Sequence, residues 1–437
     1  MKDLYIRPDC NRGSVFHPRN PGLKPGWAPF SDKKTVFILL LVALSLRVIV
    51  LFTFDSISKP QVWEYEEIAN NILKGKGLYF TLLDTKYQNT AMVLYPLTCA
   101  GIYYVTKHSF LAVKTFQILI SLLSCLIIYK LSKRIFGYIT GIIALALISI
   151  HPGLIVYSVK LHPLTLDILL FTLSIYCFFL IFNNQRVIRN SFLTGLCIGI
   201  TLLTRATIGL FLPVMIMILG YRFWSQKYKL LKIIITLGAG VFLIVSLFVA
   251  RNYIIFNRVV LLPNDSGSNF WTGNNPNSLG TANTLDGKSV MYSMPRDLSE
   301  KLKVSDEFGQ NKLFYQEAEN FIKNNPIGSL ALFGKKLYYY WWFSPNQGLN
   351  YLRSWLIMYK VYYTVILLFA ISGFFAAFKK IEPQRRYILY TLLLFFITIS
   401  IAQSLYYVEG RHRWAIEPML LIFTANGIVS IKNMVKR

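Results

Sequence analysis

Long apolar runs alternate with short polar and basic segments along most of the chain. Each run is close to the roughly twenty residues that an α-helix needs to cross the hydrocarbon core of a bilayer. Ten runs predict membrane-spanning helices: 34–54, 114–131, 138–157, 164–182, 190–204, 206–222, 230–249, 356–378, 387–407 and 414–431. With 54% hydrophobic residues, the pattern predicts an all-α, multi-pass membrane protein.

Two further apolar runs, at 89–106 and 327–343, are ambiguous, and counting them would raise the number of spans from ten to twelve. The first contains Pro96 and three tyrosines, and the second ends in "LYYYWWF". Tyr and Trp favour the head-group zone over the centre of the bilayer. Both runs are therefore predicted to be interfacial helices on the outer surface.

The charge of the loops sets the expected orientation. Lys and Arg number 46 against 20 Asp and Glu, a formal net charge of +26. The cations lie in short loops, at 129–134, 183–190, 225–232 and 379–386, and at the C-terminus. There they set orientation and contact anionic head groups, so we expect membrane lipids and no nucleic acid as partners. If all these clusters face the cytoplasm, ten spans result and both termini lie inside.

The ten-span arrangement divides the chain into four parts. Residues 1–33, rich in Pro, Asn, Gly and Arg, are expected to be a disordered cytoplasmic tail and not a cleavable signal. Residues 34–249 would form an N-terminal transmembrane module that includes a first outer loop at 55–113. A larger outer loop with interfacial helices at 250–355 and C-terminal transmembrane helices at 356–437 would follow.

The first outer loop holds a cluster of acidic residues. In "VWEYEEIANNILKGKG" (62–77), apolar residues recur at helical spacing, which predicts an amphipathic helix that Gly75 and Gly77 end. Glu64 and Glu67 share one face of this helix. Close carboxylates beside an apolar surface can raise one pKa into the range of a general base. The alternative is that both form the solvated face of an interfacial helix.

Other ionisable residues lie near the outer ends of the later spans. Asp167 is informative because an ionisable side chain inside a span costs about 2.5–3.5 kcal/mol on insertion scales and usually faces a cavity or partner; a buried pair with a neighbouring span is the alternative. The remaining candidates are Lys160, His162, Arg205, Arg251, Arg411 and Arg413. The guanidinium group matches phosphate in geometry and charge, which favours a phosphate ligand. The alternatives are anchors at helix ends and, for His162, a structural role.

Several motifs follow one another in a definite order: "WEYEEIANNILKGKGLYF", "YPLTCAGIYYV", "HPGLIVYSVKLHPLTLDILLFTL", "GLCIGITLLTRATIGLFLP" and "RHRWAIEPMLLIF". This order resembles the integral-membrane glycosyltransferases of the GT-C superfamily. The chain is most similar to glycosyltransferase family 39, which resembles the protein O-mannosyltransferases and the bacterial lipid A and polysaccharide sugar transferases. The resemblance covers almost the whole chain after residue 34 and implies a GT-C-type bundle.

The resemblance implies an inverting transferase that moves a sugar from a polyprenyl-phosphate donor to a hydroxyl of a glycan, lipid or protein acceptor. The active site would face outward from a bacterial inner or plasma membrane. Where the family commonly has an Asp in the first outer loop, this chain has Gln61 or Val62. The role of base is therefore carried to Glu64, with Glu67 and Asp55 as alternatives. No cofactor is certain; a divalent cation, Mg²⁺ or Mn²⁺, stays open, although no residues show metal-ligand spacing.

Two other functions fit a multi-pass protein with charges near the membrane. One is a flippase or transporter of lipid-linked saccharides, and the other is a polysaccharide polymerase or ligase. Transporters tend to show paired repeats and broken helices at matching positions in two halves, and the sequence shows neither. The glycosyltransferase hypothesis is therefore preferred.

Overall fold

The structure, a computed structural model, describes most of the chain: residues 32–54, 57, 59–82, 84–89, 93–182, 186–260, 266–345, 353–381 and 386–435. The tail expected at 1–33 lies outside these ranges except for its last two residues. The candidate base Asp55 also lies outside the described residues.

Within these ranges, eight helices are long and apolar enough to cross a membrane. They are α1 (Asp32–Thr53), α4 (Phe110–Phe136), α7 (Leu164–Ile181), η1 (Ala206–Leu210) continued by α9 (Phe211–Phe223), α10 (Lys227–Phe256), α15 (Arg353–Lys380), α16 (Tyr387–Ser404) and α18 (Glu417–Val435). Two shorter apolar helices are α5 (Tyr138–Ser149) and α8 (Val187–Leu202). Together they supply a helix at each of the ten predicted runs, so the expected helical bundle is confirmed.

The third predicted span, 138–157, is interrupted. α5 ends at Ser149, and a separate short helix, α6 (Pro152–Tyr157), follows. His151 between them has an extended backbone (φ −66°, ψ 115°), which is the conformation favoured before a proline. Pro152 thus ends the span and turns the chain at the end of the bundle.

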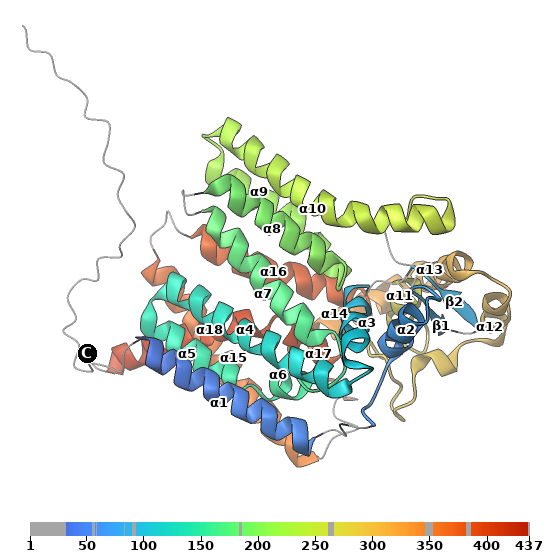
Figure 1. Cartoon of the computed structure of the whole chain (residues 1–437), viewed down its shortest axis with the longest axis horizontal. Helices are drawn as coiled ribbons and strands as arrows, with labels where there is room; N and C mark the ends of the chain where they lie inside the picture. Colours follow the sequence, from blue (N-terminus) through green and yellow to red (C-terminus); the bar gives the residue numbers. More distant parts are fainter. Residues whose placement is uncertain are drawn as a thin grey trace, which may run out of the picture.

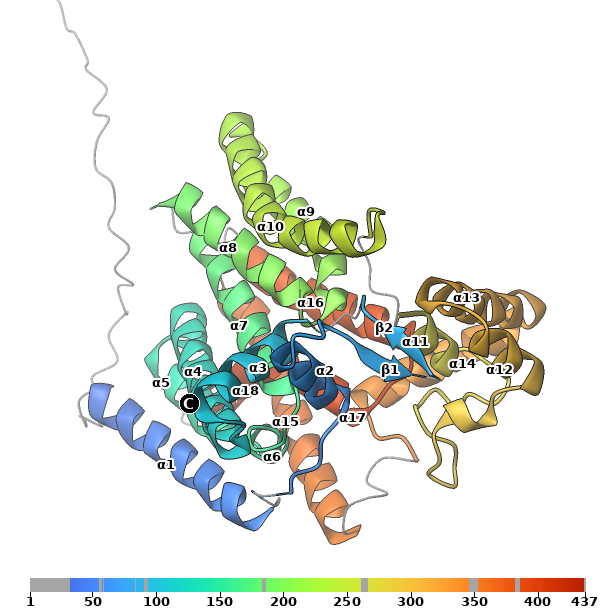
Figure 2. The same cartoon turned by 45° about the vertical axis from the view of Figure 1, so that its right-hand side comes forward.

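The remaining elements gather at one end of the bundle, which we call the loop-rich end. They are α2 (Glu64–Leu73), β1 (Phe80–Leu82), β2 (Thr85–Tyr87), α3 (Leu94–Thr106), α11 (Ser266–Gly273), η2 (Val290–Ser293), α12 (Arg296–Lys303), α13 (Glu307–Asn324), α14 (Pro326–Trp341) and α17 (Gly410–Trp414). Figure 1 shows this end on its right-hand side, and Figure 2 brings α2 and the β1–β2 hairpin forward. The hairpin is antiparallel, with Phe80 opposite Tyr87.

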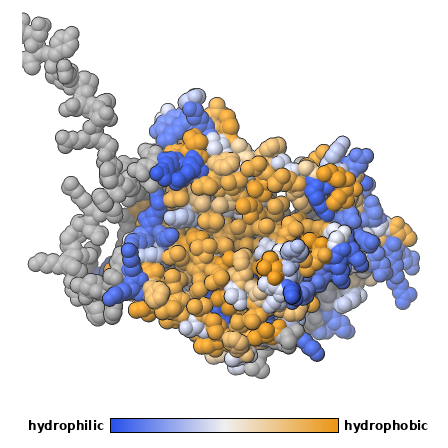
Figure 3. Space-filling model, in the orientation of Figure 1, coloured by the Kyte–Doolittle hydropathy of each residue, from blue (hydrophilic) through white to orange (hydrophobic). Residues whose placement is uncertain are grey.

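The two ambiguous apolar runs form α3 and α14, which have 13 and 16 residues. Neither is among the described helices that are long and apolar enough to cross a membrane. The face shown in Figure 3 carries hydrophobic residues over its middle and hydrophilic residues toward both ends, as expected for a bundle surrounded by lipid.

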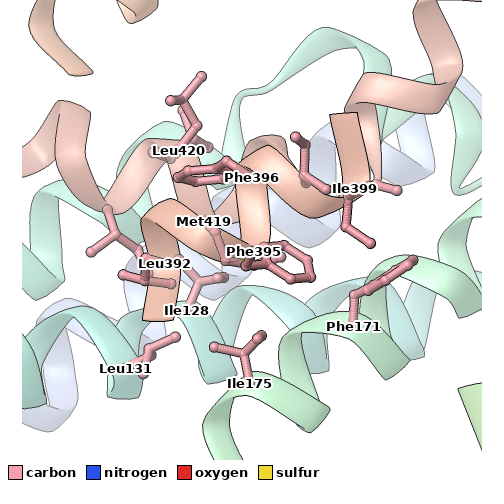
Figure 4. Close-up of a cluster of buried hydrophobic side chains, with 14 of the residues drawn as sticks. Ile128, Leu131, Phe171, Ile175, Leu392, Phe395, Phe396, Ile399, Met419 and Leu420 are labelled. Carbon is pink, nitrogen blue, oxygen red and sulfur yellow. The ribbon is translucent and has the colours of Figure 1, made fainter. Parts of the chain in front are cut away.

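The hydrophobic core joins helices from distant parts of the chain. Ile128 of α4, Phe171 of α7, Phe395 of α16 and Met419 of α18 are buried in one cluster (Figure 4). Because the C-terminal helices pack among the N-terminal ones, the predicted division at residue 356 separates parts of a single core.

Two helix pairs approach so closely that a glycine is needed at the contact. A Cβ added to Gly427 of α18 would lie 2.1 Å from the backbone oxygen of Phe369 in α15. A Cβ added to Gly195 of α8 would lie 2.1 Å from the backbone oxygen of Leu237 in α10. Within a bilayer, small residues stabilise helix pairs because they allow close van der Waals contact.

The substitution Gly427→Ala is expected to destabilise the protein, because the added methyl group must push α15 and α18 apart. Overpacking of this kind costs about 1–3 kcal/mol. Gly238→Ala in α10 is the matched control, since nothing lies within 4 Å of its added Cβ. Thermal unfolding in detergent micelles should show a lower midpoint for the first variant alone; equal midpoints would contradict the role assigned to this contact.

Candidate functional site

The turn between α6 and α7 buries His162 beneath α2. Its Nδ1 accepts a hydrogen bond from the backbone N–H of Leu164 at 3.1 Å. The rings of Trp63, Tyr65 and Tyr157 meet the imidazole edge to face, with centroids 5.5, 5.9 and 5.2 Å away. The start of α2 is therefore packed onto the turn that leads into α7.

Cations from separate segments lie within electrostatic range of this imidazole. Burial lowers the pKa of His162 well below its usual value, and Arg411, Arg205, His412 and Lys160 lower it further by their positive charge. His162 is consequently neutral at pH 7. The candidates Lys160, Arg205 and Arg411, which are far apart in sequence, lie within electrostatic range of one side chain.

Arg205 is oriented by the intramembrane carboxylate. Its Nε donates to Oδ2 of Asp167 at 3.1 Å, and Asp167 is fully buried while the Arg205 side chain is 11% exposed. Among the described residues, none accepts a hydrogen bond from either terminal nitrogen of Arg205. Asp167 therefore forms a buried ion pair, as the alternative interpretation expected. The pair uses only Nε of Arg205, so the two terminal nitrogens can bind a ligand.

Lys160 is half-buried among aromatic rings. Its Nζ lies 5.6 Å from the ring centroids of Phe54 and Tyr157 and 6.0 Å from that of Trp63. Cation–π contacts of this kind stabilise an ammonium group in a partly desolvated position. The three rings therefore stabilise the positive charge of Lys160 at the edge of the site.

Arg411 lies on the short helix α17, where Glu409 holds it through an Nε–Oε2 contact of 2.8 Å. Burial lowers the pKa of Arg411, but Glu409 and then Tyr407, Tyr157 and Tyr65 raise it more, and the pKa lies above its usual value. Arg411 therefore stays charged at every accessible pH.

Glu64, the first residue of α2, is exposed at the edge of this group. Burial raises the pKa values of Tyr65 and Tyr407; Glu64 raises both further, and Arg411 lowers both. Glu64 and Arg411 thus lie within electrostatic range of the same two phenols. Among the described residues, none forms a hydrogen bond or ion pair with the Glu64 carboxylate.

The other acids of α2 hold the scaffold together. Glu66 accepts a hydrogen bond from the Tyr103 hydroxyl at 2.7 Å and pairs with His108 at 3.0 Å. Glu67, an alternative candidate base, accepts from the backbone N–H and the hydroxyl of Thr81, each at 3.1 Å. Glu66 therefore joins α2 to α3 and the segment after it, and Glu67 joins α2 to β1.

The carboxylates of α2 do not form one set of metal ligands, because Glu66 and Glu67 have separate protein partners. Across the part of the chain that the structure describes, no three His, Cys, Asp or Glu side chains come together in a way that could hold a metal ion. The Mg²⁺ or Mn²⁺ option remains a prediction from the resemblance, and the chemistry proposed for this site does not use it.

Two of the candidate arginines have several protein partners. Arg251 of α10 donates from Nη1 to the carbonyl of Gln88 at 2.7 Å and from Nη2 to that of Leu78 at 3.2 Å. Arg413 is fully buried, and its Nε donates to Glu417 at 2.5 Å. This geometry favours an anchoring role for Arg251, between the β1–β2 region and α10, and for Arg413, between α17 and α18.

Buried charges continue beyond Arg413. Glu417 also pairs with His151, and the Arg413 guanidinium lies over the Tyr363 ring, 3.7 Å from its centroid. These contacts connect the α5–α6 junction with α15 and α18. They form a buried network next to the partly buried cations of the site.

Tyr340 of α14 contacts this network, because its carbonyl accepts a hydrogen bond from Nη1 of Arg413 at 3.4 Å. Burial raises the pKa of Tyr340, while the charges of Arg205 and Arg413 lower it. Its hydroxyl is buried and has no hydrogen-bond partner among the described residues. An unpaired buried hydroxyl costs free energy, so this group is suited to a ligand oxygen.

An apolar groove lies along α14, where Leu337 and Trp341 line it. It has a volume of ≈ 510 Å³ and lies between α14, α15, α16 and α18, with Trp341, Phe375 and Ile397 among its lining residues. Phe375 is 64% exposed and Ile397 is 44% exposed, so the groove opens sideways toward the position of the lipid.

Three residues of the site were not candidates from the sequence: Tyr340, Tyr407 and Glu409. Tyr340 belongs to the aromatic run that predicted a head-group location. Glu409 lies two residues before Arg411, a spacing that could have indicated their pairing.

A family model described as dolichyl-phosphate-mannose-protein mannosyltransferase matches residues 91–250. Over the whole bundle, the chain superposes on the archaeal oligosaccharyltransferase AglB from Archaeoglobus fulgidus, in complex with an inhibitory peptide and a dolichol-phosphate. The TM-score is 0.57, with 13% identity over 93% of this chain and 51% of AglB. The chain has the GT-C fold.

The apo form of AglB gives the GT-C likeness again, with a TM-score of 0.56 and 13% identity over 92% of this chain and 51% of that one. This chain therefore spans about half the length of AglB. ArnT from Cupriavidus metallidurans bound to undecaprenyl phosphate aligns with a TM-score of only 0.41, at 13% identity over 91% of this chain and 78% of ArnT. No curated protein matches the sequence.

Protonation of His162 is expected to destabilise the fold. The pKa of His162 is lowered in the folded protein, so the unfolded chain binds the proton more readily, and stability falls as the pH drops below about 6.5. At pH 5.5 this one group would lower the free energy of unfolding by about 1.4 kcal/mol relative to neutral pH. Thermal midpoints at pH 7.5 and 5.5 should differ less for His162→Gln than for the unchanged protein; an equal fall in both would refute this.

Proposed function

We propose that the protein is a membrane glycosyltransferase that moves a sugar from a polyprenyl-phosphate-linked donor to an acceptor hydroxyl. One observation carries the proposal: Lys160, Arg205 and Arg411, from separate segments, all lie within electrostatic range of the neutral His162 at the end of an apolar bundle. The match of residues 91–250 to the dolichyl-phosphate-mannose-protein mannosyltransferase family model supports a lipid-linked donor. So does the dolichol-phosphate in the AglB complex.

Arg205 is suited to the donor phosphate. Asp167 fixes its Nε, and its terminal nitrogens can form two parallel hydrogen bonds to phosphate oxygens. Arg411, held at Nε by Glu409, and Lys160 add positive charge beside it. As the bond between the anomeric carbon and the phosphate oxygen breaks, these groups stabilise the charge that develops on the polyprenyl phosphate.

Glu64 is the proposed base. The acceptor oxygen attacks the anomeric carbon from the face opposite the phosphate, so the configuration inverts, and the hydroxyl proton passes to the Glu64 carboxylate. The exposure of Glu64 and its lack of a described partner suit a group that must meet an incoming acceptor. Arg413 and Arg251 would act by holding the surrounding helices.

The apolar groove along α14–α16 and α18 is the proposed place for the polyprenyl tail. Its sideways opening permits entry from the bilayer. The buried Tyr340 hydroxyl, which lies within electrostatic range of Arg205, is the proposed contact for the head group. The loop-rich end would face outward, because the Lys and Arg clusters lie at the opposite end and such clusters favour the cytoplasmic side. A multi-pass protein of a bacterial inner or plasma membrane fits this orientation.

Replacement of the base tests the mechanism. Glu64→Gln should lower turnover by about a hundredfold or more, because a positioned base contributes about 10²–10⁴. The measurement is acceptor-dependent release of free polyprenyl phosphate from a radiolabelled polyprenyl-phosphate sugar by the purified protein. Glu67→Gln is the matched control and should lose much less, since Glu67 binds Thr81.

Full activity of Glu64→Gln would remove Glu64 as the base, and a larger loss in Glu67→Gln would transfer the role. Movement of the labelled lipid across liposomes without sugar transfer would instead support the flippase. Sugar chains that lengthen on the lipid carrier itself would support the polymerase.

The substitution Arg205→Lys should weaken donor binding about tenfold or more, because an ammonium group cannot form two parallel bonds to phosphate. Binding of the polyprenyl-phosphate sugar can be titrated by the quenching of tryptophan fluorescence. Arg251→Lys is the control, and it should change thermal stability more than donor affinity because Arg251 binds backbone carbonyls. Unchanged donor affinity in Arg205→Lys would overturn the assignment of the phosphate site.

A further inference from the structure

A second charged pocket lies at the end of the bundle opposite the candidate site. It has a volume of ≈ 430 Å³ and is formed where α8 and α10 begin. Four cations line it: Arg186, Arg189, Lys229 and Lys232. No carboxylate is among its lining residues. In sequence these cations belong to two loop clusters, and the fold unites them in one hollow.

The two helix starts add to the positive potential. α8 follows Arg186, and α10 follows Gln226; neither residue caps its helix with a side-chain hydrogen bond, and neither helix has an acidic residue in its first turn. The first N–H groups of a helix carry partial positive charge and need acceptors. Cations near a helix N-terminus are unfavourable for the same reason. A bound anion would therefore reduce the repulsion among the four cations and also the repulsion between these cations and the helix N–H groups.

The surroundings of the pocket are those of a lipid head-group layer. Tyr221, Trp224 and Tyr228 are 69%, 71% and 73% exposed, and exposed Tyr and Trp are typical of the membrane interface. The Lys232 ammonium lies 4.3 Å from the centroid of the Tyr228 ring, which lines the pocket. The cations are therefore held at the depth where phosphates of the bilayer lie.

An exposed apolar face leads away from the pocket along α10. Leu231, Ile235 and Phe242 on this helix are 55%, 61% and 72% exposed. A free anion would contact only the cations, whereas a phospholipid would also cover this face with its acyl chains. The continuity of the basic pocket and the apolar face selects a lipid as the occupant.

We propose that this pocket is a binding site for the phosphate head group of an anionic phospholipid. The lipid would contact Arg189 from α8 and Lys232 from α10 and would link the starts of the two helices. This site is separate from the donor phosphate site and does not depend on the proposed transferase activity.

The test uses the full chain, stripped of lipid in detergent, with phosphatidylglycerol as the probe and binding measured by native mass spectrometry. The double variant Arg189→Gln/Lys232→Gln should bind phosphatidylglycerol about thirtyfold more weakly, given the contribution of each cation near an anionic surface. Both residues are exposed, so the double variant should melt like the unchanged protein when lipid is absent. Lys130→Gln/Arg134→Gln is the control, because it removes two exposed cations from the neighbouring helix α4 outside the pocket.

Tight binding of phosphatidylglycerol, weak binding of phosphatidylcholine and normal binding in the control variant would support the site. An equal loss of affinity in the control would show general attraction to net charge and would overturn the proposal. Unchanged affinity in the Arg189/Lys232 variant would overturn it as well. Inorganic phosphate that competes at the same concentration as phosphatidylglycerol would show a site for a soluble anion and not for a lipid.

Discussion

The ion pair between Arg205 and Asp167 is the contact on which the arrangement of the site depends. Asp167 is fully buried near the start of α7, and Arg205 begins the turn that leads into η1. Removing one partner from a buried pair leaves an uncompensated charge, which typically costs 3–5 kcal/mol. The pair therefore fixes where α7 and η1 meet and, through Nε, how the guanidinium is directed. The hydrogen bond from Nε to Asp167 sets the direction of the two terminal nitrogens before any ligand binds.

The other ion pairs at the loop-rich end divide the charged residues into two groups. Glu66 with His108, and Arg413 with Glu417 and His151, connect elements from distant parts of the chain. In an environment of low dielectric constant such partners are required, because an unpaired charge is much more costly than a satisfied one. In the proposed site, the Glu64 carboxylate, the terminal nitrogens of Arg205 and the Tyr340 hydroxyl have no hydrogen-bond partner among the described residues. A scaffold of paired charges thus allows a few less satisfied groups to persist beside an apolar groove.

The two ends of the bundle differ in the way their charges are compensated. At the loop-rich end, Arg205 and Arg411 each have a carboxylate partner. At the far end, the pocket between α8 and α10 has cations and no lining carboxylate. Protein acids can orient cations for a transient ligand, whereas a group of cations with no carboxylate among its described lining residues suits contact with an anionic surface. This asymmetry agrees with an orientation in which chemistry takes place at the loop-rich end.

The amino-acid sequence by itself predicted a helix at each of the ten apolar runs and the amphipathic helix within residues 62–77. These are local properties: a backbone inside a bilayer must satisfy its own hydrogen bonds, so an apolar run of sufficient length forms a helix whatever its neighbours are. The resemblance in motif order also identified the GT-C fold correctly. The break at Pro152 is a local signal too, although the expected span ran through it.

The partners of the charged residues were decided only by the tertiary structure. Glu64, Glu66 and Glu67 occupy one helix, yet Tyr103 and Thr81, from other elements, distinguish them. Arg205 and Asp167 are 38 residues apart, and His151 and Glu417 are 266 apart. An ion pair forms only where two helix ends lie next to each other. Helix packing decides which ends are neighbours, and it depends on contacts between residues far apart in the sequence. The sequence could therefore propose the ionisable residues, but only the fold could separate those that hold the scaffold from those that remain open to a ligand.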